Sequence, residues 1–324
     1  MSSKVRGKVN EKKRAPAAKT VPDELDGRFV DAIVRSLYDV SWGDARAWIA
    51  RGAVRVDGAV MTQATTTVHK GATVTIELNA PRRRAPHEIS KERIAHIDAH
   101  VVVVNKPPGV SSIAFDEKET GTLDEKVRDY LSATTRGAKG RPSLGVVHRL
   151  DKETSGLMVF TRTWLAKQSL TSQFRAHTVE REYFAIVHGN IRSQTITSHI
   201  VADRGDGLRG SIEAMRNRLG RGAEGQLAVT HIEAIEKLQG ATLIKCRLET
   251  GRTHQIRIHL SEAGHPIVGE RVYIRGFTGE AIEAPRVMLH AARLGFVHPV
   301  GDKEVHWEEP MPSDMAAVYA ALRA

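Results

Sequence analysis

Cysteine is almost missing from this chain, because Cys246 is the only one among 324 residues. A single thiol cannot form an internal disulfide, a CxxC redox motif or a cysteine zinc site, so we expect a reducing compartment. No apolar run approaches the ~18 residues that a membrane-spanning helix needs. The N-terminus is basic and polar, with no apolar segment behind it that would form a secretory signal. These absences predict a cytoplasmic protein.

Aromatic residues are also few, at 5% of the chain, but hydrophobic residues make up 41% and charged residues 27%. This composition is typical of a globular protein with buried cores, and it excludes wholesale disorder, collagen and a membrane bundle. A chain of this length suits two domains of ordinary size.

Positive charge is concentrated in two segments. Residues 1–20 carry seven basic side chains against Glu11, a net +6, and the arginines at 82–84 add +3 to a total of +10. Both segments have few large apolar residues, so we predict a flexible basic arm over 1–22 and an Arg/Pro linker over 81–94. Such arms bind RNA or DNA by releasing counterions, and a solubilising tail is the alternative.

Residues 23–80 have the pattern of a small unit of two short helices and several strands. Apolar residues recur at helical spacing over 29–37 and 45–49, and Gly52 suits the end of the second helix. Residues 54–58 alternate as a strand and end in Asp-Gly, which is a hairpin turn signal.

This unit resembles the S4 RNA-binding domain. The residues that carry the resemblance are Ser41, Ile49, Gly52, Val54, Val56, Gly58 and a Lys70-Gly71 turn before the alternating run Val74, Ile76, Leu78. The resemblance implies a small α/β domain that binds RNA. Trp42 and Asp57 stand where many S4 domains carry Arg and Asn, so the helix that faces RNA is less basic here.

Residues 95–324 change to longer strands separated by loops and helices, which predicts a mixed α/β or α+β domain with a large sheet. The predicted strands are Val101 to Val104, Leu157 to Thr161, Tyr183 to Val187, Thr230 to Ile235 and Thr242 to Leu248, and the predicted helices are Trp164 to Arg175 and Thr253 to Glu262. Residues 203–225 hold six glycines and five arginines without apolar periodicity, which indicates a mobile excursion from the sheet.

The residues from His148 to Leu157 read His-Arg-Leu-Asp-Lys-Glu-Thr-Ser-Gly-Leu and lead into an apolar strand. An aspartate such as Asp151 is most often a turn or capping residue when taken alone. This string fixes eight residue types, which at ~5% frequency each occur together by chance on the order of once in a hundred million chains. It closely resembles the signature of the RluA-type pseudouridine synthases, which implies that Asp151 is the catalytic residue.

Further segments resemble the same family in the same chain order. They are Val104 to Val110, Arg181 to Gly189, Glu249 to His259 and Leu289 to Pro299, so that the resemblance covers about residues 95–312. The resemblance implies an α+β pseudouridine synthase domain with a large mixed, mainly antiparallel sheet flanked by helices.

The resemblance also implies the chemistry. Isomerisation of uridine breaks the N–C glycosidic bond, rotates the uracil and rejoins it through C5, so we expect no cofactor. The site needs a carboxylate that stays ionised while shielded from water, and a nearby cation favours that form. The family gives these roles to Asp151 and Arg257, and Tyr183 would lie against the base and remove the C5 proton. The sequence leaves open whether Asp151 attacks the base or the sugar, or removes a ribose proton.

The target nucleotide must leave stacked or paired RNA, at a cost of about a few kcal/mol. The resemblance implies that Arg149 holds the extruded form, because a guanidinium stacks on bases and binds phosphate. Lys106 is a second candidate for RNA binding, with a structural turn lysine as its alternative, and Ile258 is a candidate apolar lid on the uracil. We expect His148 to support its loop rather than to transfer protons.

Hydrolytic chemistry fits the sequence poorly. The fifteen histidines form no HExxH motif, and His254 and His259 lie five positions apart on different helix faces, so we expect no metal. Ser155, His148 and Asp151 are neighbours in one stretch without a GxSxG elbow, which argues against a hydrolase triad.

The expected partner is structured RNA. An S4-like unit joined to this catalytic domain resembles enzymes of large-subunit (23S-type) ribosomal RNA, by analogy, with transfer RNA as the alternative. A non-catalytic RNA-binding or ribosome-assembly protein on the same fold is the rival, although such a protein could dispense with Asp151, Tyr183 and Arg257. We expect a monomer without membrane contact.

Overall fold

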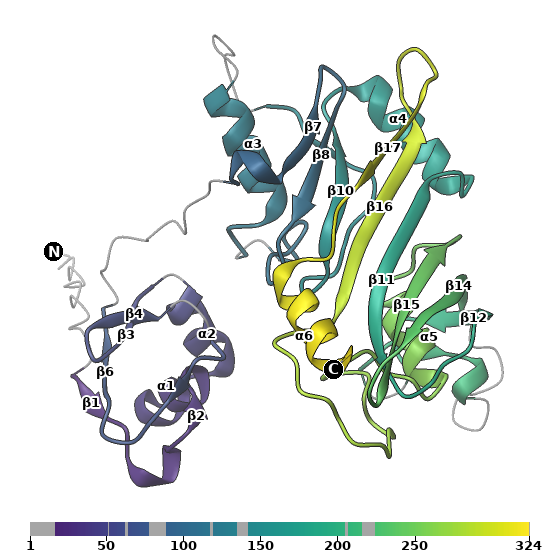
Figure 1. Ribbon diagram of the computed structural model, residues 1–324. Coiled ribbons are helices and arrows are strands. Elements are labelled where there is room, and N and C mark those ends of the chain that lie inside the picture. The colour runs from purple at the N-terminus through teal and green to yellow at the C-terminus, as the bar shows by residue number, and fades with distance from the viewer. Residues whose placement is uncertain are drawn as a thin grey trace, which may run out of the picture. The chain divides into compact units, whose positions relative to one another are not determined.

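The computed structural model divides the chain into two compact units, Met1–Pro86 and His87–Ala324 (Figure 1). It describes residues 17–50, 52–61, 64–77, 89–116, 119–134, 142–204, 207–215 and 224–323. Most of the predicted basic arm and of the predicted linker, together with parts of the 203–225 segment, lie outside the described residues. Lys19–Thr20 form a strand and Val21 is buried, so the prediction of a flexible arm is wrong for these three residues.

The first unit packs two helices against small antiparallel sheets. Helix α1 (Val30–Tyr38) and helix α2 (Trp42–Ala50) bury Ile33, Val34 and Ile49 in one shared core. A four-stranded sheet runs in the order β1 (Lys19–Thr20), β6 (Thr73–Ile76), β3 (Val54–Val56) and β4 (Ala59–Met61), while β2 (Arg28–Phe29) pairs with β5 (Thr67–Val68) and η1 (Asp23–Leu25) is a 3-10 turn.

The turn between β3 and β4 confirms the predicted hairpin. Asp57 and Gly58 have φ values of 47° and 80°, the pair of positive angles that a type I′ turn requires. The Asp57 carboxylate also accepts a hydrogen bond from the Thr73 backbone N–H at 2.8 Å, which ties the hairpin to β6. Helix α2 ends just before Gly52, as predicted.

The second unit is built on one mixed sheet of eleven strands. Their order is β13 (Gly210–Ser211), β12 (Gln194–Val201), β14 (Gln226–Lys237), β15 (Ala241–Leu248), β11 (Glu180–His188), β16 (Leu289–Val297), β10 (Ser155–Thr161), β8 (Val101–Lys106) and β7 (Ile94–Ile97), with β17 (Glu304–Glu308) beside β16 and β9 (Gly145–Val146) beside β10. Among the described pairs, β10 and β16 run parallel and the others antiparallel.

Helices flank this sheet on both faces. They are α3 (Leu123–Thr134), α4 (Trp164–Arg175), α5 (Gln255–Glu262) and α6 (Ser313–Arg323), with 3-10 turns η2 (Lys91–Arg93) and η3 (Glu213–Met215). Alternate residues of β8 face opposite sides, since Val102 and Val104 share a core with α3, α5 and α6, whereas Val101 and Val103 share one with α4. Burial on both faces explains why β8 reads as a continuous apolar run.

The predicted α+β class with a large mixed, mainly antiparallel sheet is confirmed, and α4 has its predicted bounds. Strands β12 and β16 and helices α3 and α6 are additions to the predicted elements. Gly210–Ser211 pairs with β12, so the prediction that the 203–225 segment stands apart from the sheet is wrong for these two residues. No helix among the described residues is long and apolar enough to cross a membrane.

Candidate active site

The loop that carries Asp151 enters strand β10 through a position that only glycine can fill. Gly156 has a φ of 111°, and a Cβ there would lie 2.2 Å from the carbonyl oxygen of Ala291 on β16. The missing side chain therefore allows β10 and β16 to pair closely directly after the loop.

Two side chains, one at the end of β8 and one in the loop that follows it, hold the backbone on either side of Asp151. Ser112 Oγ donates to the Leu150 carbonyl at 2.7 Å and accepts from the Leu150 N–H at 3.0 Å. Lys106 Nζ donates to the Lys152 carbonyl at 3.0 Å. The position of Asp151 is thus fixed by contacts to both of its neighbours.

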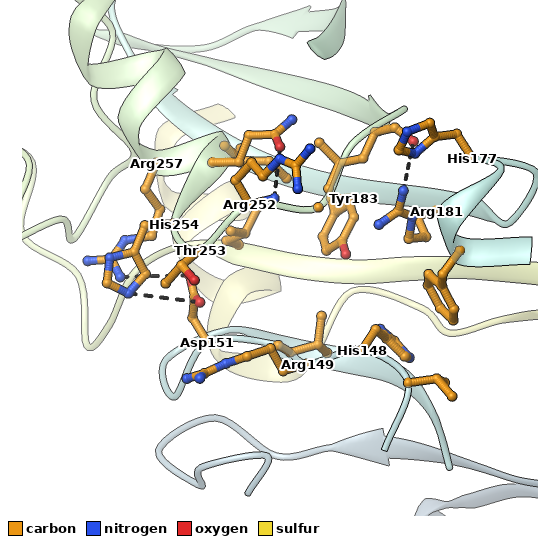
Figure 2. Close-up of a pocket in the computed structure, with 18 of the residues that line it drawn as sticks. His148, Arg149, Asp151, His177, Arg181, Tyr183, Arg252, Thr253, His254 and Arg257 are labelled. Carbon is orange, nitrogen blue, oxygen red and sulfur yellow. Dashed lines mark hydrogen bonds and ion pairs between the residues drawn. The ribbon is translucent and has the colours of Figure 1, made fainter. Parts of the chain in front are cut away.

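Asp151 faces Arg257 and His254 at the start of α5 (Figure 2). Arg257 Nη1 lies 3.9 Å from Asp151 Oδ2, and His254 Nε2 lies 3.9 Å from Oδ1. These distances exceed hydrogen-bond length, so the carboxylate is paired by charge while its oxygens keep their lone pairs for another partner. The Asp151 side chain is 17% exposed.

Arg257 is fixed by Glu270, a residue that the sequence patterns do not single out. Its Nε donates to Oε2 of Glu270 at 2.6 Å and its Nη2 to Oε1 at 2.7 Å. The same Oε1 accepts backbone N–H groups of residues 271–273. Gly269 precedes it with a φ of 79°, and a Cβ there would lie 1.9 Å from the Arg286 carbonyl oxygen. The Gly269-Glu270 pair, which follows the segment from Glu249 to His259, marks a turn in the sequence but does not show that Glu270 contacts Arg257.

Burial and ion pairing oppose each other in this cluster. Burial disfavours the charged Arg257 guanidinium, but the hydrogen bonds and charge of Glu270, and then the charge of Asp151, raise its pKa. Burial disfavours ionised Glu270, but Arg257 lowers its pKa. Burial lowers the pKa of His254, so a neutral imidazole faces Asp151 at neutral pH. Arg257 is therefore the cation that balances Asp151.

The open side of Asp151 faces a pocket of about 500 Å³, a volume typical of small-ligand sites. Tyr183 on β11 lines this pocket and is 7% exposed. Its hydroxyl turns toward the loop of His148 and Arg149 in Figure 2. Burial raises the pKa of Tyr183, so its phenol is protonated at neutral pH.

The pocket is strongly basic. Among its described lining residues Asp151 is the only acid, whereas five are arginines: Arg149, Arg175, Arg181, Arg252 and Arg257. Arg181 is buried and donates to the Glu249 carbonyl at 2.8 Å, while its Nε has no hydrogen-bond partner within the described structure. No group of three or more His, Cys, Asp or Glu side chains that could hold a metal occurs in the described ranges.

His148 packs inside the loop, in line with its expected supporting role. Its Nε2 accepts the backbone N–H of Val159 at 3.0 Å, and its ring stacks on Phe174 with centroids 4.7 Å apart. Burial lowers the pKa of His148 to about 3, so the imidazole is neutral at physiological pH.

The structure does not bring all predicted residues to the pocket. Arg149 lines it and is exposed. Lys106 is 0% exposed, and its Nζ donates to the carbonyls of Pro107 and Val110 as well as Lys152. Ile258 is 1% exposed and packs in a separate apolar cluster with Ile200, Ala228 and Tyr273. Lys106 and Ile258 thus face the protein interior.

Comparisons with known proteins identify the family of the chain. Residues 100–262 match the family described as RNA pseudouridylate synthase. A Zymomonas mobilis protein named ribosomal large subunit pseudouridine synthase D is 37% identical over 255 residues, which cover 77% of this chain and 78% of the relative. A Nitrosomonas europaea protein of the same name is 34% identical over 313 residues, 94% of this chain and 87% of the relative.

A solved structure of human RNA pseudouridylate synthase domain containing 4 shares the fold. The TM-score is 0.57 at 23% identity, over 72% of this chain and 93% of the human chain. Residues 100–262, which match the family, contain the loop of Asp151, Tyr183 and the start of α5, and all three line the pocket. The chain therefore belongs to the RNA pseudouridylate synthase family.

Proposed function

We propose that this chain converts uridine to pseudouridine in large-subunit ribosomal RNA, with Asp151 as the catalytic carboxylate. The observation that carries the proposal is a single carboxylate in a pocket of arginines, 3.9 Å from Arg257 and without a hydrogen bond to it. The names of the Zymomonas mobilis and Nitrosomonas europaea relatives support ribosomal over transfer RNA.

The geometry supports Asp151 as the group that starts the reaction. Its side chain is 17% exposed and lies 3.9 Å from the Arg257 guanidinium, and its free oxygen can approach the nucleoside. The N1–C1′ bond breaks, the uracil turns, and a C5–C1′ bond forms as the C5 proton leaves and N1 gains one. The product is an isomer of the substrate, so no redox partner enters the balance.

Tyr183 is the proposed acceptor of the C5 proton. A neutral phenol must lose its own proton before it can accept the C5 proton, and the overall step balances because N1 of the uracil gains one proton as C5 loses one. The phenolate formed on this route is favoured by a cation beside it. Arg181 supplies that charge, because it is buried two residues away on β11 and its proximity lowers the pKa of Tyr183 against the effect of burial. The two residues together would lower the cost of this step.

Arg149 is the proposed contact for the extruded nucleotide. It is exposed at the pocket, beside Asp151 on the same loop, and its guanidinium can stack on a base or bind a phosphate. Lys106 acts on RNA only indirectly in this scheme, by holding the loop of Asp151, and Ile258 supports α5 from within.

The first unit is proposed to act as an S4-like RNA-binding domain over residues 23–80, with the basic arm 1–22 adding affinity. The exposed Trp42 ring on α2 lies within cation–π distance of two guanidinium groups, 5.1 Å from that of Arg35 and 5.4 Å from that of Arg46. An exposed aromatic ring with cations close by suits a nucleic-acid backbone and its bases. The RNA substrate and the single cysteine support a cytoplasmic location.

Release of tritium from RNA labelled at uridine C5 tests the function. The wild type should release tritium from a large-subunit ribosomal RNA transcript, and Asp151→Asn should not, while both bind the transcript equally. The matched control is Asp129→Asn on α3. Release by Asp151→Asn would refute the catalytic assignment, release only from transfer RNA would refute the substrate, and binding without release by the wild type would favour the non-catalytic rival.

Deletion of residues 1–16 tests the separate role of the arm, because it keeps strand β1 and the buried Val21 of the first unit. RNA affinity should fall mainly at low salt, because the arm contributes counterion release, while the single-turnover rate at saturating RNA stays the same. A collapse of that rate would refute the division between binding and chemistry.

A further inference from the structure

Helix α4 presents one continuous exposed face to solvent. Six exposed side chains spaced three or four residues apart lie on it and line a groove: Trp164, Lys167, Gln168, Thr171, Ser172 and Arg175. The opposite face buries Ala166 and Leu170 in the core beneath. The groove face thus has no part in packing the sheet.

Trp164 is unusual on this face, because it is 75% exposed. The helix does not need its ring, since the core contacts of α4 come from Ala166, Leu170 and Phe174 and its N-terminus is capped by Thr163 Oγ1, which accepts the Ala166 N–H at 3.2 Å. A large ring left in water at a fixed position is available for a partner with flat surfaces.

The charge of the groove points to a polyanion. Helix α4 contains no acidic residue, and Lys167 and Arg175 are exposed along its groove face. The stretch from Trp164 to Arg175 extends about 16 Å at 1.5 Å per residue, enough for more than one nucleotide.

The groove adjoins the active-site pocket, because Thr171 and Arg175 line both. A strand whose nucleotide enters the pocket can therefore reach α4 within a few ångströms of chain. This position suits the strand that carries the extruded nucleoside.

We propose that the α4 groove binds the RNA strand that flanks the extruded uridine. Trp164 stacks on an unpaired base, and Lys167 and Arg175 contact phosphates between that base and the pocket. The inference rests on the proposed action on RNA and names a second RNA contact for the same site.

The test uses the full-length chain and the labelled ribosomal transcript. Trp164→Ala should raise Kd and KM about tenfold, because it loses the stacking of one base, and kcat should stay the same. The matched control is Leu165→Ala, an exposed apolar neighbour (48%) that does not line the groove and should leave both constants unchanged. Trp164→Phe should restore most of the affinity.

Two further measurements exclude a merely structural role. Lys167→Gln should reduce the salt dependence of log Kd by about one ion. Iodide should quench the fluorescence of Trp164 in the free protein but not in the complex with the transcript. The contribution of Trp164 is the difference in fluorescence between the wild type and Trp164→Phe.

The outcomes separate this inference from the proposed function. If the wild type releases tritium but Trp164→Ala has the same Kd and KM as Leu165→Ala, the α4 proposal alone is overturned. Absence of release by the wild type would overturn the proposed function. If Trp164→Ala binds RNA as the wild type does but loses binding to another protein, the groove is assigned to a protein partner and the RNA contact is refuted.

Discussion

Glu270→Gln is predicted to slow catalysis although Glu270 does not line the active-site pocket. The wild-type carboxylate holds Arg257 through two short hydrogen bonds and accepts three backbone N–H groups as well. A glutamine has one acceptor oxygen. If that oxygen keeps the backbone contacts, its amide NH2 faces an N–H donor of Arg257.

The magnitude follows from the lost bonds. A hydrogen bond to a charged group contributes about 1.5–3 kcal/mol, and breaking a buried ion pair by removing one partner costs about 3–5 kcal/mol. Arg257, freed from Glu270, should close the 3.9 Å gap to Asp151 and engage the lone pairs that the substrate needs. A penalty of about 2 kcal/mol on the chemical step corresponds to a roughly 30-fold fall in kcat.

The assay is tritium release at saturating RNA, together with urea unfolding to measure stability. Glu283→Gln, at an exposed position, is the control and should change neither quantity. Glu270→Asp keeps the charge and should recover part of kcat. If folded Glu270→Gln retained wild-type kcat, the 3.9 Å separation would not be a functional feature and the reasoning would fail.

Three other substitutions test the groups around the pocket. The His148 pKa is about 3 in the folded state against 6.5 in the unfolded state. Between these values only the unfolded chain binds the proton, so the free energy of unfolding is unaffected above pH 6.5 and falls by ~1.4 kcal/mol per pH unit from there toward pH 3. His148→Gln should remove this one-proton pH dependence of the free energy of unfolding, measured by urea titrations at several pH values. Lys106→Met leaves three backbone carbonyls without their donor and should lower the free energy of unfolding, measured with urea, by about 3 kcal/mol. Because one of these carbonyls belongs to the loop of Asp151, kcat for tritium release should fall as well. Tyr183→Phe should keep RNA affinity but slow tritium release by about 100-fold, and an unchanged rate would remove its proton-transfer role.

Local patterns predicted the parts of the fold that depend on local physics. Helix α4 has apolar Ala166, Leu170 and Phe174 at helical spacing, and its bounds follow from them. The hairpin at Asp57 needs only two residues that tolerate positive φ. Helix α3 has the same spacing in Leu123, Val127 and Leu131, so its sequence held a helix signal that the prediction missed. Strand β12, which lies next to the short edge strand β13, alternates too irregularly to be predicted.

Side-chain direction at the site was beyond the sequence. Ile258 follows Arg257 on α5, and consecutive helical residues point about 100° apart, so one reaches toward Asp151 while the other is buried against β12 and β14. Lys106 ends β8 near the Asp151 loop, but its ammonium turns to backbone carbonyls. Glu270 belongs to the site only because the chain after α5 folds back onto Arg257, a contact that no local pattern encodes.

The sheet order explains why the signature of this family includes residues with no chemical role. Strands β10 and β11 follow each other in the chain, yet β16 from the C-terminal part lies between them in the sheet (Figure 1). Asp151 precedes β10 and Tyr183 lies on β11, so their spacing across the pocket depends on β16, whose Leu289 lines the pocket. Gly156 admits the backbone of β16, and Ser155 Oγ lies 2.9 Å from His290 Nδ1 on that strand. The Ser-Gly pair of the motif therefore fixes a long-range strand contact, and through it the distance between the carboxylate and the phenol.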